Sequence, residues 1–390
     1  MRKFISGNEA LAHGVRLARP HVISAYPITP QTTVVEHLSS MCLKGSLKAE
    51  FVHVESEHSA LSCAIGAAAT GARTFTATSS QGLLYMAECL HYAAGGRFPV
   101  VMMNANRSTA LPWNIYGDQR DSLGLLDQGW IQLYAENAQE SLDMALVAYR
   151  VAEDPRVMTP VMINMDGFLL THTYEVVDIP EQEQADRYLP PYVTSNRFDF
   201  DKPKSLAFSV GPEQNYRFKF REHQAMLRAK EVIAEAERSF AGIFGRAYTH
   251  LVENYRCDDA EYVIVTLGSV AGLVRSVTDE LRSEGFAAGM LRIRYMRPFP
   301  EKDVAEALKG VKGAAVLEKD ISFGYEGTVF TNVNSALQGQ GVNVKTCNVI
   351  GGLGGADISR EQIREIFYSL KNGAERRVTF IGISGDEYDD

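Results

Sequence analysis

Short apolar segments alternate with segments of helical spacing between residues 22 and 164, and this alternation constrains the fold more than any other feature of the sequence. Six segments are typical of strands: 22–25, 51–54, 73–78, 98–104, 131–134 and 157–164. Four of the segments between them are typical of helices: 31–43, 60–71, 83–94 and 138–151. Strands that are separated by helices run in the same direction, so the pattern predicts an α/β fold with a parallel sheet covered on both faces.

The second half of the chain repeats the alternation, with expected strands at 262–267, 288–293, 313–317 and 342–349. Residues 171–216 carry five prolines and little periodicity, which predicts an extended linker, and a long helix is expected from 221 to about 254. Residues 106–129 and 294–300 read as loops, and a loop as long as the first is usually functional. We therefore expect a first domain at 1–240 that includes a linker at about 171–220, a second α/β domain at 255–385, and a frayed acidic end at 385–390.

Charge and cysteine content narrow the class of protein. The net charge of −9 argues against nucleic-acid binding, because nucleic-acid-binding proteins usually present a basic face. The sequence shows no signal peptide and no apolar run near the ~20 residues of a membrane span, so we expect a cytoplasmic protein without a membrane contact. The cysteines are Cys42, Cys63, Cys89, Cys257 and Cys347. They include no CxxC pair, which predicts reduced thiols and no iron–sulfur cluster bound by this chain alone.

Polar side chains follow four of the predicted strands. Thr29 lies in Tyr26-Pro27-Ile28-Thr29-Pro30, whose two prolines predict a stiff loop after the first strand. Glu57 follows the second strand, Gln81 the third and Arg107 the fourth. Open α/β sheets bind their ligands beyond the carboxyl ends of the strands, so we expect these four side chains at one shared site.

Each of these residues also has a simpler interpretation. Glu57 begins a predicted helix, where a carboxylate also serves as a cap. Thr29 suits a turn, and an arginine such as Arg107 often forms a surface salt bridge. However, Arg107 leaves a buried strand for a long loop, and its planar guanidinium suits the bidentate binding of a carboxylate. The residues alone leave a ligand-binding site and a structural role both open.

Several common motifs are missing or incomplete. The glycines between 351 and 355 do not have the spacing of a dinucleotide fingerprint and come late in their domain, so they indicate a tight strand–helix turn. His53 and His58 lie on either side of a predicted strand–helix junction, and we expect no metal site on this chain. Ser56 and Ser80 lack the nucleophile elbow of a hydrolase.

Five sequence motifs occur together in a fixed order along the chain. They are Tyr26-Pro-Ile-Thr-Pro30, Val54-Glu-Ser-Glu57, Thr76-Ala-Thr-Ser-Ser-Gln-Gly82, Asn106-Arg107, and Gly129-Trp-Ile-Gln132 with Asp166-Gly-Phe168. In this order they resemble the α subunit of the pyruvate:ferredoxin oxidoreductases, within the wider 2-oxoacid:ferredoxin oxidoreductase family. The resemblance covers nearly the whole chain.

The resemblance implies a pyrimidine-type thiamine diphosphate-binding domain followed by a transketolase C-terminal-like domain. Glu57 matches the family's glutamate at the aminopyrimidine ring, and Thr29 and Arg107 match the residues at the substrate's carboxylate and carbonyl. The implied cofactor contacts are Glu57, Tyr26, Pro27, Ile28 and Gln81, and the implied substrate contacts are Thr29, Arg107 and Asn114. The implied reaction is the CoA-dependent oxidative decarboxylation of a 2-oxoacid, with electrons passed to ferredoxin.

Two features expected of such an enzyme are missing from this sequence. We find no Gly-Asp-Gly…Asn motif for magnesium and diphosphate, and no grouped cysteines for clusters. The resemblance therefore implies a β subunit that carries the diphosphate and Mg2+ site, together with γ and ferredoxin-like δ subunits. The [4Fe-4S] clusters would belong to these partners, in a dimer of heteromers that uses coenzyme A and ferredoxin.

The sequence leaves more than one substrate and more than one class of function open. Thr29 suits a pyruvate enzyme, whereas the family's oxalate enzymes carry an arginine there. Trp113 suits a larger pocket, which keeps branched-chain and aromatic 2-oxoacids such as 2-oxoisovalerate and phenylglyoxylate open. A non-redox enzyme of the transketolase kind is disfavoured, because it would carry the diphosphate motif on the same chain. A non-catalytic scaffold subunit is the alternative from another class.

Overall fold

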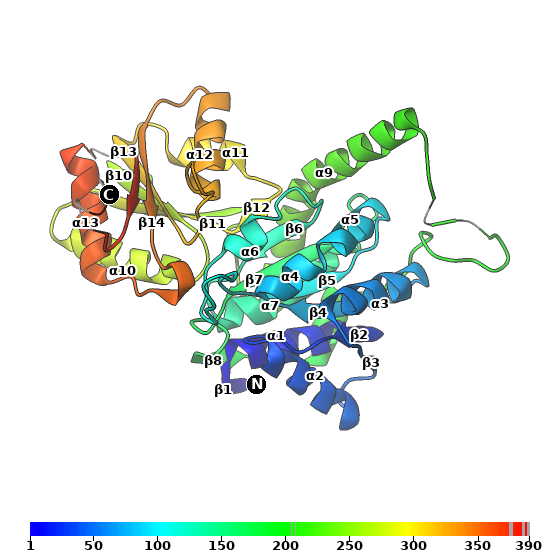
Figure 1. Cartoon of the computed structure of the whole chain (residues 1–390). Coiled ribbons are helices and arrows are strands. Elements are labelled where there is room, and N and C mark those ends of the chain that lie inside the picture. The colour runs from blue at the N-terminus through cyan, green and yellow to red at the C-terminus, as the bar shows by residue number, and fades with distance from the viewer. Residues whose placement is uncertain (204, 207, 374–376, 384–386, 388–390) are drawn as a thin grey trace.

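The computed structural model describes residues 1–203, 205–206, 208–373, 377–383 and 387. These residues form two large sheets and one two-stranded ribbon. Figure 1 shows the two sheets side by side, one built mainly by the first half of the chain and one by the second half. The predicted α/β fold is confirmed. The end expected to fray, 385–390, lies outside the described residues except for Glu387.

The larger sheet has seven strands in the order β12-β6-β7-β5-β4-β2-β3. They are β2 (Val22–Ala25), β3 (Glu50–His53), β4 (Thr74–Thr78), β5 (Val101–Asn106), β6 (Ile131–Tyr134), β7 (Val161–Asp166) and β12 (Tyr295–Arg297). Neighbouring strands are parallel except for β12, which pairs antiparallel with β6. All six strands predicted for the first half are present, and their carboxyl ends lie along one edge.

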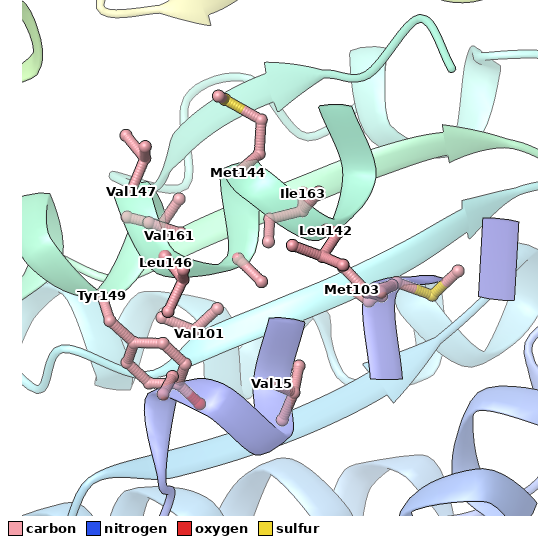
Figure 2. Close-up of a cluster of buried hydrophobic side chains, with 14 of the residues drawn as sticks. Val15, Val101, Met103, Leu142, Met144, Leu146, Val147, Tyr149, Val161 and Ile163 are labelled. Atoms are coloured by element: carbon pink, nitrogen blue, oxygen red, sulfur yellow. The ribbon is translucent and has the colours of Figure 1, made fainter. Parts of the chain in front are cut away.

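Side chains alternate between the two faces of the larger sheet along each strand, so both faces present apolar side chains. Helices cover both of these faces. Val101 and Met103 of β5 join one apolar cluster, whereas Met102 joins another. One face packs against α1 (Gly7–Ala18), α2 (Thr32–Leu43), α7 (Ala138–Ala152) and α9 (Pro212–Phe244). The other packs against α3 (Glu57–Ala69), α4 (Ser80–Tyr85) and α5 (Ala87–Gly95). Figure 2 shows the first cluster, in which Val15 of α1 and Leu142 of α7 lie over β5.

The smaller sheet has six strands in the order β15-β14-β13-β10-β11-β9. They are β9 (Val252–Tyr255), β10 (Tyr262–Thr266), β11 (Ala288–Ile293), β13 (Gly313–Glu318), β14 (Lys345–Ile350) and β15 (Val378–Phe380). All pairs are parallel except β9 with β11. Helices α10 (Val270–Ser283) and α13 (Arg360–Asn372) cover one face, and α11 (Glu301–Ala307) and α12 (Thr328–Gly339) cover the other.

The segment between the sheets differs from the prediction. It contains β8 (Tyr174–Asp178) and α8 (Gln182–Tyr188), so residues 171–216 are not an extended linker throughout. β8 pairs antiparallel with β1 (Arg2–Ser6), and local periodicity cannot reveal a partner so distant in the sequence. Helix α9 begins at Pro212, a position that favours proline, and ends before Gly245, which adopts a left-handed conformation. The helix predicted at 221–254 is therefore shifted toward the N-terminus.

The loop predicted at 294–300 is also wrong, because it contains β12, which completes the edge of the larger sheet. Two buried arginines beside β12 hold it there. The Nη1 atom of Arg292 donates to Glu136 Oε2 at 3.0 Å, and Nε of Arg294 donates to Glu140 Oε1 at 2.9 Å. Ion pairs between the two halves of the chain thus stabilise β12 at this edge of the sheet. A pattern of apolar residues does not predict such ion pairs.

Candidate active site

The carboxyl ends of β2 to β5 bring three of the predicted site residues into direct contact. Thr29 follows β2, Gln81 lies in α4 after β4, and Arg107 follows β5. The Nη1 atom of Arg107 donates to the Thr29 carbonyl oxygen at 2.7 Å, and Nη2 donates to Gln81 Oε1 at 3.0 Å. The shared edge expected from the sequence is therefore where these residues meet.

Arg107 has the properties of a buried ligand-binding cation. Its side chain is 4% exposed, so it does not form a surface salt bridge. Its Nε is buried and has no hydrogen-bond partner among the described residues. Burial lowers the pKa of its guanidinium, and the nearby carboxylates of Asp121 and Glu57 oppose that change. A buried N–H without a partner next to a positive charge favours the binding of an anionic acceptor.

Glu57 is the first residue of α3 and is 8% exposed. The helix cap is Ser56, whose Oγ accepts a hydrogen bond from the backbone N of Ser59 at 3.2 Å. Among the described residues, no hydrogen bond involves the Glu57 carboxylate. Gly82 leaves room for this carboxylate, because a Cβ at Gly82 would lie 2.7 Å from Glu57 Oε1. The carboxylate is therefore buried and available to a ligand.

Asp121 is a residue of this edge that sequence analysis missed. It lies in α6 (Arg120–Leu123), a short helix within the segment predicted as a loop, and its side chain is fully buried. Its carboxylate accepts hydrogen bonds from the backbone N of Ser80, Arg107 and Ser122 and from the side chains of Asn104 and Asn106. Burial raises the pKa of Asp121 to about 6. Since Ser80 precedes Gln81, one carboxylate fixes the backbone beside both Gln81 and Arg107.

A cavity of about 550 Å3 opens beside Arg107. It is lined by Thr29, Arg107, Trp113, Asn114, Ile115 and Tyr116. The Trp113 ring lies over the guanidinium, with 5.5 Å between the ring centroid and Cζ, and this arrangement favours a cation–π contact. Asn114 lines the cavity, and its Nδ2 donates to the carbonyl oxygen of Gly354 at 2.7 Å.

The outer rim of this edge is apolar and open. Tyr26, Pro27 and Thr29 are exposed and Ile28 is half-buried. Trp113, which lines the cavity, is 69% exposed. Apolar side chains that gather at the rim of a polar site are typical of a surface that another molecule covers.

The remaining features expected from the sequence have other outcomes. The glycine-rich segment after β14 forms a tight turn with a short 3-10 helix, η1 (Leu353–Gly355). No group of three or more His, Cys, Asp or Glu among the described residues is placed to hold a metal ion. No described helix is both long enough and apolar enough to cross a bilayer.

Comparison with known families shows which family the chain belongs to. Residues 13–238 match the family described as pyruvate flavodoxin/ferredoxin oxidoreductase, thiamine diphosphate-binding. Residues 260–363 match pyruvate:ferredoxin oxidoreductase core domain II. The chain belongs to the pyruvate:ferredoxin oxidoreductase family. Membership confirms the resemblance seen in the five motifs and makes the chain a subunit of a thiamine diphosphate-dependent oxidoreductase.

Known members of the pyruvate:ferredoxin oxidoreductase family align with this chain over nearly its full length. It is 46% identical over 381 residues to the pyruvate synthase subunit PorA of Methanothermobacter thermautotrophicus, which covers 98% of both chains. It is 42% identical over 379 residues to the ketoisovalerate oxidoreductase subunit VorA of Pyrococcus horikoshii, which covers 96% of this chain and 95% of that subunit. Family membership thus does not distinguish between a small and a branched 2-oxoacid as the substrate.

Two solved structures share the fold of this family member. The 2-oxoglutarate:ferredoxin oxidoreductase from Magnetococcus marinus, with 2-oxoglutarate, coenzyme A and succinyl-CoA bound, superposes with a TM-score of 0.72 at 19% identity. The match covers 95% of this chain and 65% of that chain. A split-gene transketolase gives a TM-score of 0.50 at 13% identity, over 95% of this chain and 98% of that chain. The fold is therefore a thiamine diphosphate-binding α/β domain followed by a transketolase C-terminal-like domain.

Proposed function

We propose that this chain is the α subunit of a cytoplasmic, CoA-acylating 2-oxoacid:ferredoxin oxidoreductase whose substrate is pyruvate. The products are acetyl-CoA, CO2 and reduced ferredoxin. The observation that carries the proposal is the buried guanidinium of Arg107, in contact with Thr29 and Gln81 and without a partner at Nε. The 46% identity to a pyruvate synthase subunit supports pyruvate. Residues 1–240 act as the pyrimidine-type domain and 255–385 as the transketolase C-terminal-like domain.

The residues at this edge fit the aminopyrimidine end of thiamine diphosphate. Glu57 presents a buried carboxylate with no hydrogen-bond donor from the described residues, and Gly82 leaves space beside it. The contacts proposed for the ring are Glu57, Gln81 and the loop residues Tyr26, Pro27 and Ile28. When bound, the cofactor supplies the electron sink that decarboxylation of a 2-oxoacid requires.

The chain's own residues move a proton and orient the substrate. Glu57 would hold the aminopyrimidine end of the bound cofactor, and its carboxyl group would be the one to give or take a proton there, within hydrogen-bond reach. Arg107 and Thr29 hold the carboxylate and carbonyl side of the 2-oxoacid, so that its reacting carbon is presented in one orientation. Such orientation lowers a barrier by several kcal/mol, and exclusion of water strengthens both interactions.

The residues at the rim of the site and the cysteines of the chain both support an active site that partner chains complete. The apolar rim formed by Tyr26, Ile28 and Trp113 suits a β subunit that brings the diphosphate and Mg2+ site. All five cysteines are free thiols and are not grouped as cluster ligands, which supports [4Fe-4S] clusters on partner subunits. We therefore propose γ and ferredoxin-like δ subunits in a dimer of heteromers, with coenzyme A and ferredoxin as reaction partners.

A branched-chain 2-oxoacid is the second candidate substrate. The 42% identity to a ketoisovalerate oxidoreductase subunit favours it, as does Trp113, which lines the cavity and suits a larger pocket. Assay of the copurified complex with pyruvate, 2-oxoisovalerate and phenylglyoxylate, each with CoA and ferredoxin, decides between these substrates by the highest kcat/KM.

Glu57→Gln in the reconstituted complex tests the catalytic assignment. Glutamine keeps the size of the side chain but does not exchange a proton, so CO2 release falls by about two to four orders of magnitude. Unchanged CO2 release would remove Glu57 from catalysis and favour a scaffold role for this chain. Turnover by the isolated chain without ferredoxin would contradict the redox assignment.

A further inference from the structure

One segment of the first half of the chain shapes most of the cavity beside Arg107. We call residues 108–118 the pocket loop. It supplies Trp113, Asn114, Ile115 and Tyr116, and the other lining residues are Thr29 and Arg107. The position of the pocket loop therefore decides how wide a side chain fits beside the guanidinium.

The base of the pocket loop is held by the larger sheet and its neighbours. The backbone N of Ser108 donates to the Tyr116 carbonyl oxygen at 3.0 Å, which closes the loop on itself. The hydroxyl of Ser80 donates to the Ser108 carbonyl oxygen at 2.8 Å. The Tyr116 ring packs against Phe168 with 5.1 Å between the ring centroids. These contacts fix where the loop starts and ends.

The tip of the pocket loop is held by the other half of the chain. The Nδ2 atom of Asn114 donates to the Gly354 carbonyl oxygen at 2.7 Å, while Asn114 Oδ1 accepts from the backbone N of Tyr116 at 2.7 Å. The backbone N of Gly354 donates in turn to Oδ2 of the buried Asp118 at 3.1 Å. The pocket loop and the turn after β14 therefore exchange hydrogen bonds in both directions.

A residue with a side chain fits this turn only if the neighbouring Asn114 amide moves. Gly354 has a φ of 59°, and a Cβ there would lie 2.6 Å from Asn114 Nδ2. Any larger residue has to push the Asn114 amide away. Trp113 precedes Asn114, is 69% exposed and lies over Arg107, so a displacement of the Asn114 backbone moves the indole relative to Arg107 and changes the width of the cavity.

We propose that the turn at Gly354 sets the width of the substrate cavity, and that Asn114 and Gly354 are positioning residues through which the second half of the chain selects the side chain of the 2-oxoacid. The proposal rests on the proposed function, since it concerns the same cavity. It gives Asn114 a different role from substrate contact: the amide holds the wall and does not bind the acid. One methylene in an apolar pocket changes kcat/KM by about 10- to 200-fold, so a small displacement of the loop is measurable.

Two variants break the contact in different ways, and each has a matched control. Asn114→Asp keeps the acceptor for Tyr116 but replaces the donor to Gly354 with a carboxylate oxygen. Asn343→Asp makes the same change at an exposed position. Gly354→Ala adds the obstructing methyl group. Gly341→Ala is its control, because Gly341 also has a positive φ of 68° but a Cβ there meets nothing within 4 Å.

The test measures kcat/KM of the intact complex for pyruvate, 2-oxobutyrate and 2-oxoisovalerate. We expect the ratio of 2-oxoisovalerate to pyruvate to rise about tenfold or more in Asn114→Asp and Gly354→Ala, and to stay at the wild-type value in both controls. Hydrogen exchange supplies a second readout that does not depend on activity. The amides of Ser108 and Tyr116 should exchange faster in the two variants than in their controls.

The outcomes separate this inference from the proposed function. If the wild-type complex decarboxylates none of the three acids, the proposed function fails. If the wild type is active but both variants keep its substrate ratio, the inference alone fails. An equal loss of kcat/KM on all three acids also overturns the inference, as does unchanged hydrogen exchange in the pocket loop. Selection by the loop requires a change in both the substrate ratio and the exchange rates.

Discussion

Glu57 and Gly82 are in direct contact where α3 passes α4. A Cβ placed on Gly82 would lie 2.7 Å from Glu57 Oε1, 2.8 Å from its Cγ and 2.6 Å from Thr78 Oγ1, all closer than side-chain contacts allow. The carboxylate of Glu57 thus occupies the space that the missing side chain leaves. Since α3 and α4 follow different strands, this contact fixes the acidic group relative to the rest of the site.

Gly82→Ala should therefore displace the side chains of Glu57 and Thr78 while leaving the helix intact. Alanine is favourable in a helix interior, so the fold is retained. We expect CO2 release to fall by about tenfold or more, because a displacement near 1 Å at a catalytic group has effects up to about 100-fold. Gly66→Ala is the matched control, since Gly66 also lies in a helix and a Cβ there meets nothing within 4 Å. Equal activity of the two variants would show that the position of Glu57 does not matter.

Arg107→Lys tests the substrate-binding role. The guanidinium contacts Thr29 and Gln81 through different nitrogens and still has Nε available, whereas an ammonium carries all its donors on one nitrogen and does not form this planar fork. We expect KM for the 2-oxoacid to rise and kcat to fall together, with a loss in kcat/KM of about 100-fold. Arg217→Lys, on the exposed start of α9, should behave as wild type. An unchanged kcat/KM in Arg107→Lys would exclude Arg107 from the substrate site.

Asp121→Asn tests whether the buried carboxylate organises the site. Burial raises the pKa of Asp121 to about 6, so in wild type the group loses an acceptor as the pH falls through 6. We expect an acid limb in kcat/KM near pH 6 for wild type. Asp121→Asn should lack this limb and have a lower plateau, by about 10- to 100-fold, because an amide nitrogen does not accept the bonds that the carboxylate accepts. Persistence of the limb in the variant would assign it to another group.

The contrast between Glu57 and Asp121 shows what the sequence reveals about this site. Glu57, Gln81 and Arg107 were predictable because each follows a clear apolar strand, and parallel strands deliver their ends to one edge. Asp121 follows no strand. It lies in a four-residue helix within a long irregular segment, and its partners come from β5 and α4. Its role depends on contacts that only the folded chain creates.

The elements that sequence analysis missed have the same origin. β1 pairs with β8, and β12 leaves the second half of the chain to pair with β6. The bond between Asn114 and Gly354 joins residues 240 positions apart. Propensity and periodicity report local structure, so they predicted most strands and helices of both sheets but none of these long-range pairings.

Glu318→Gln tests a buried carboxyl group that lies outside the candidate site. Glu318 ends β13, and its carboxyl oxygens accept hydrogen bonds from the backbone N of Val329 at 2.8 Å and of Phe330 at 3.1 Å, at the start of α12. Burial is the largest influence on this group and raises its pKa to about 8, well above the ordinary value of 4.5. The folded protein therefore retains a proton that the unfolded chain releases between these two pH values.

The sign of the effect follows from this difference in proton binding. A raised pKa in the folded state gives a contribution to stability that is complete below pH 4.5 and is lost as the pH rises through 8. Between these values the free energy of unfolding should fall by about 1.4 kcal/mol per pH unit relative to Glu318→Gln, which carries no titrating group there. Urea unfolding of both proteins from about pH 5 to pH 9 measures the difference, with Glu365→Gln on the exposed face of α13 as the control. Parallel pH profiles for wild type and Glu318→Gln would mean that Glu318 is already ionised in the folded protein, and that its helix-capping hydrogen bonds outweigh burial.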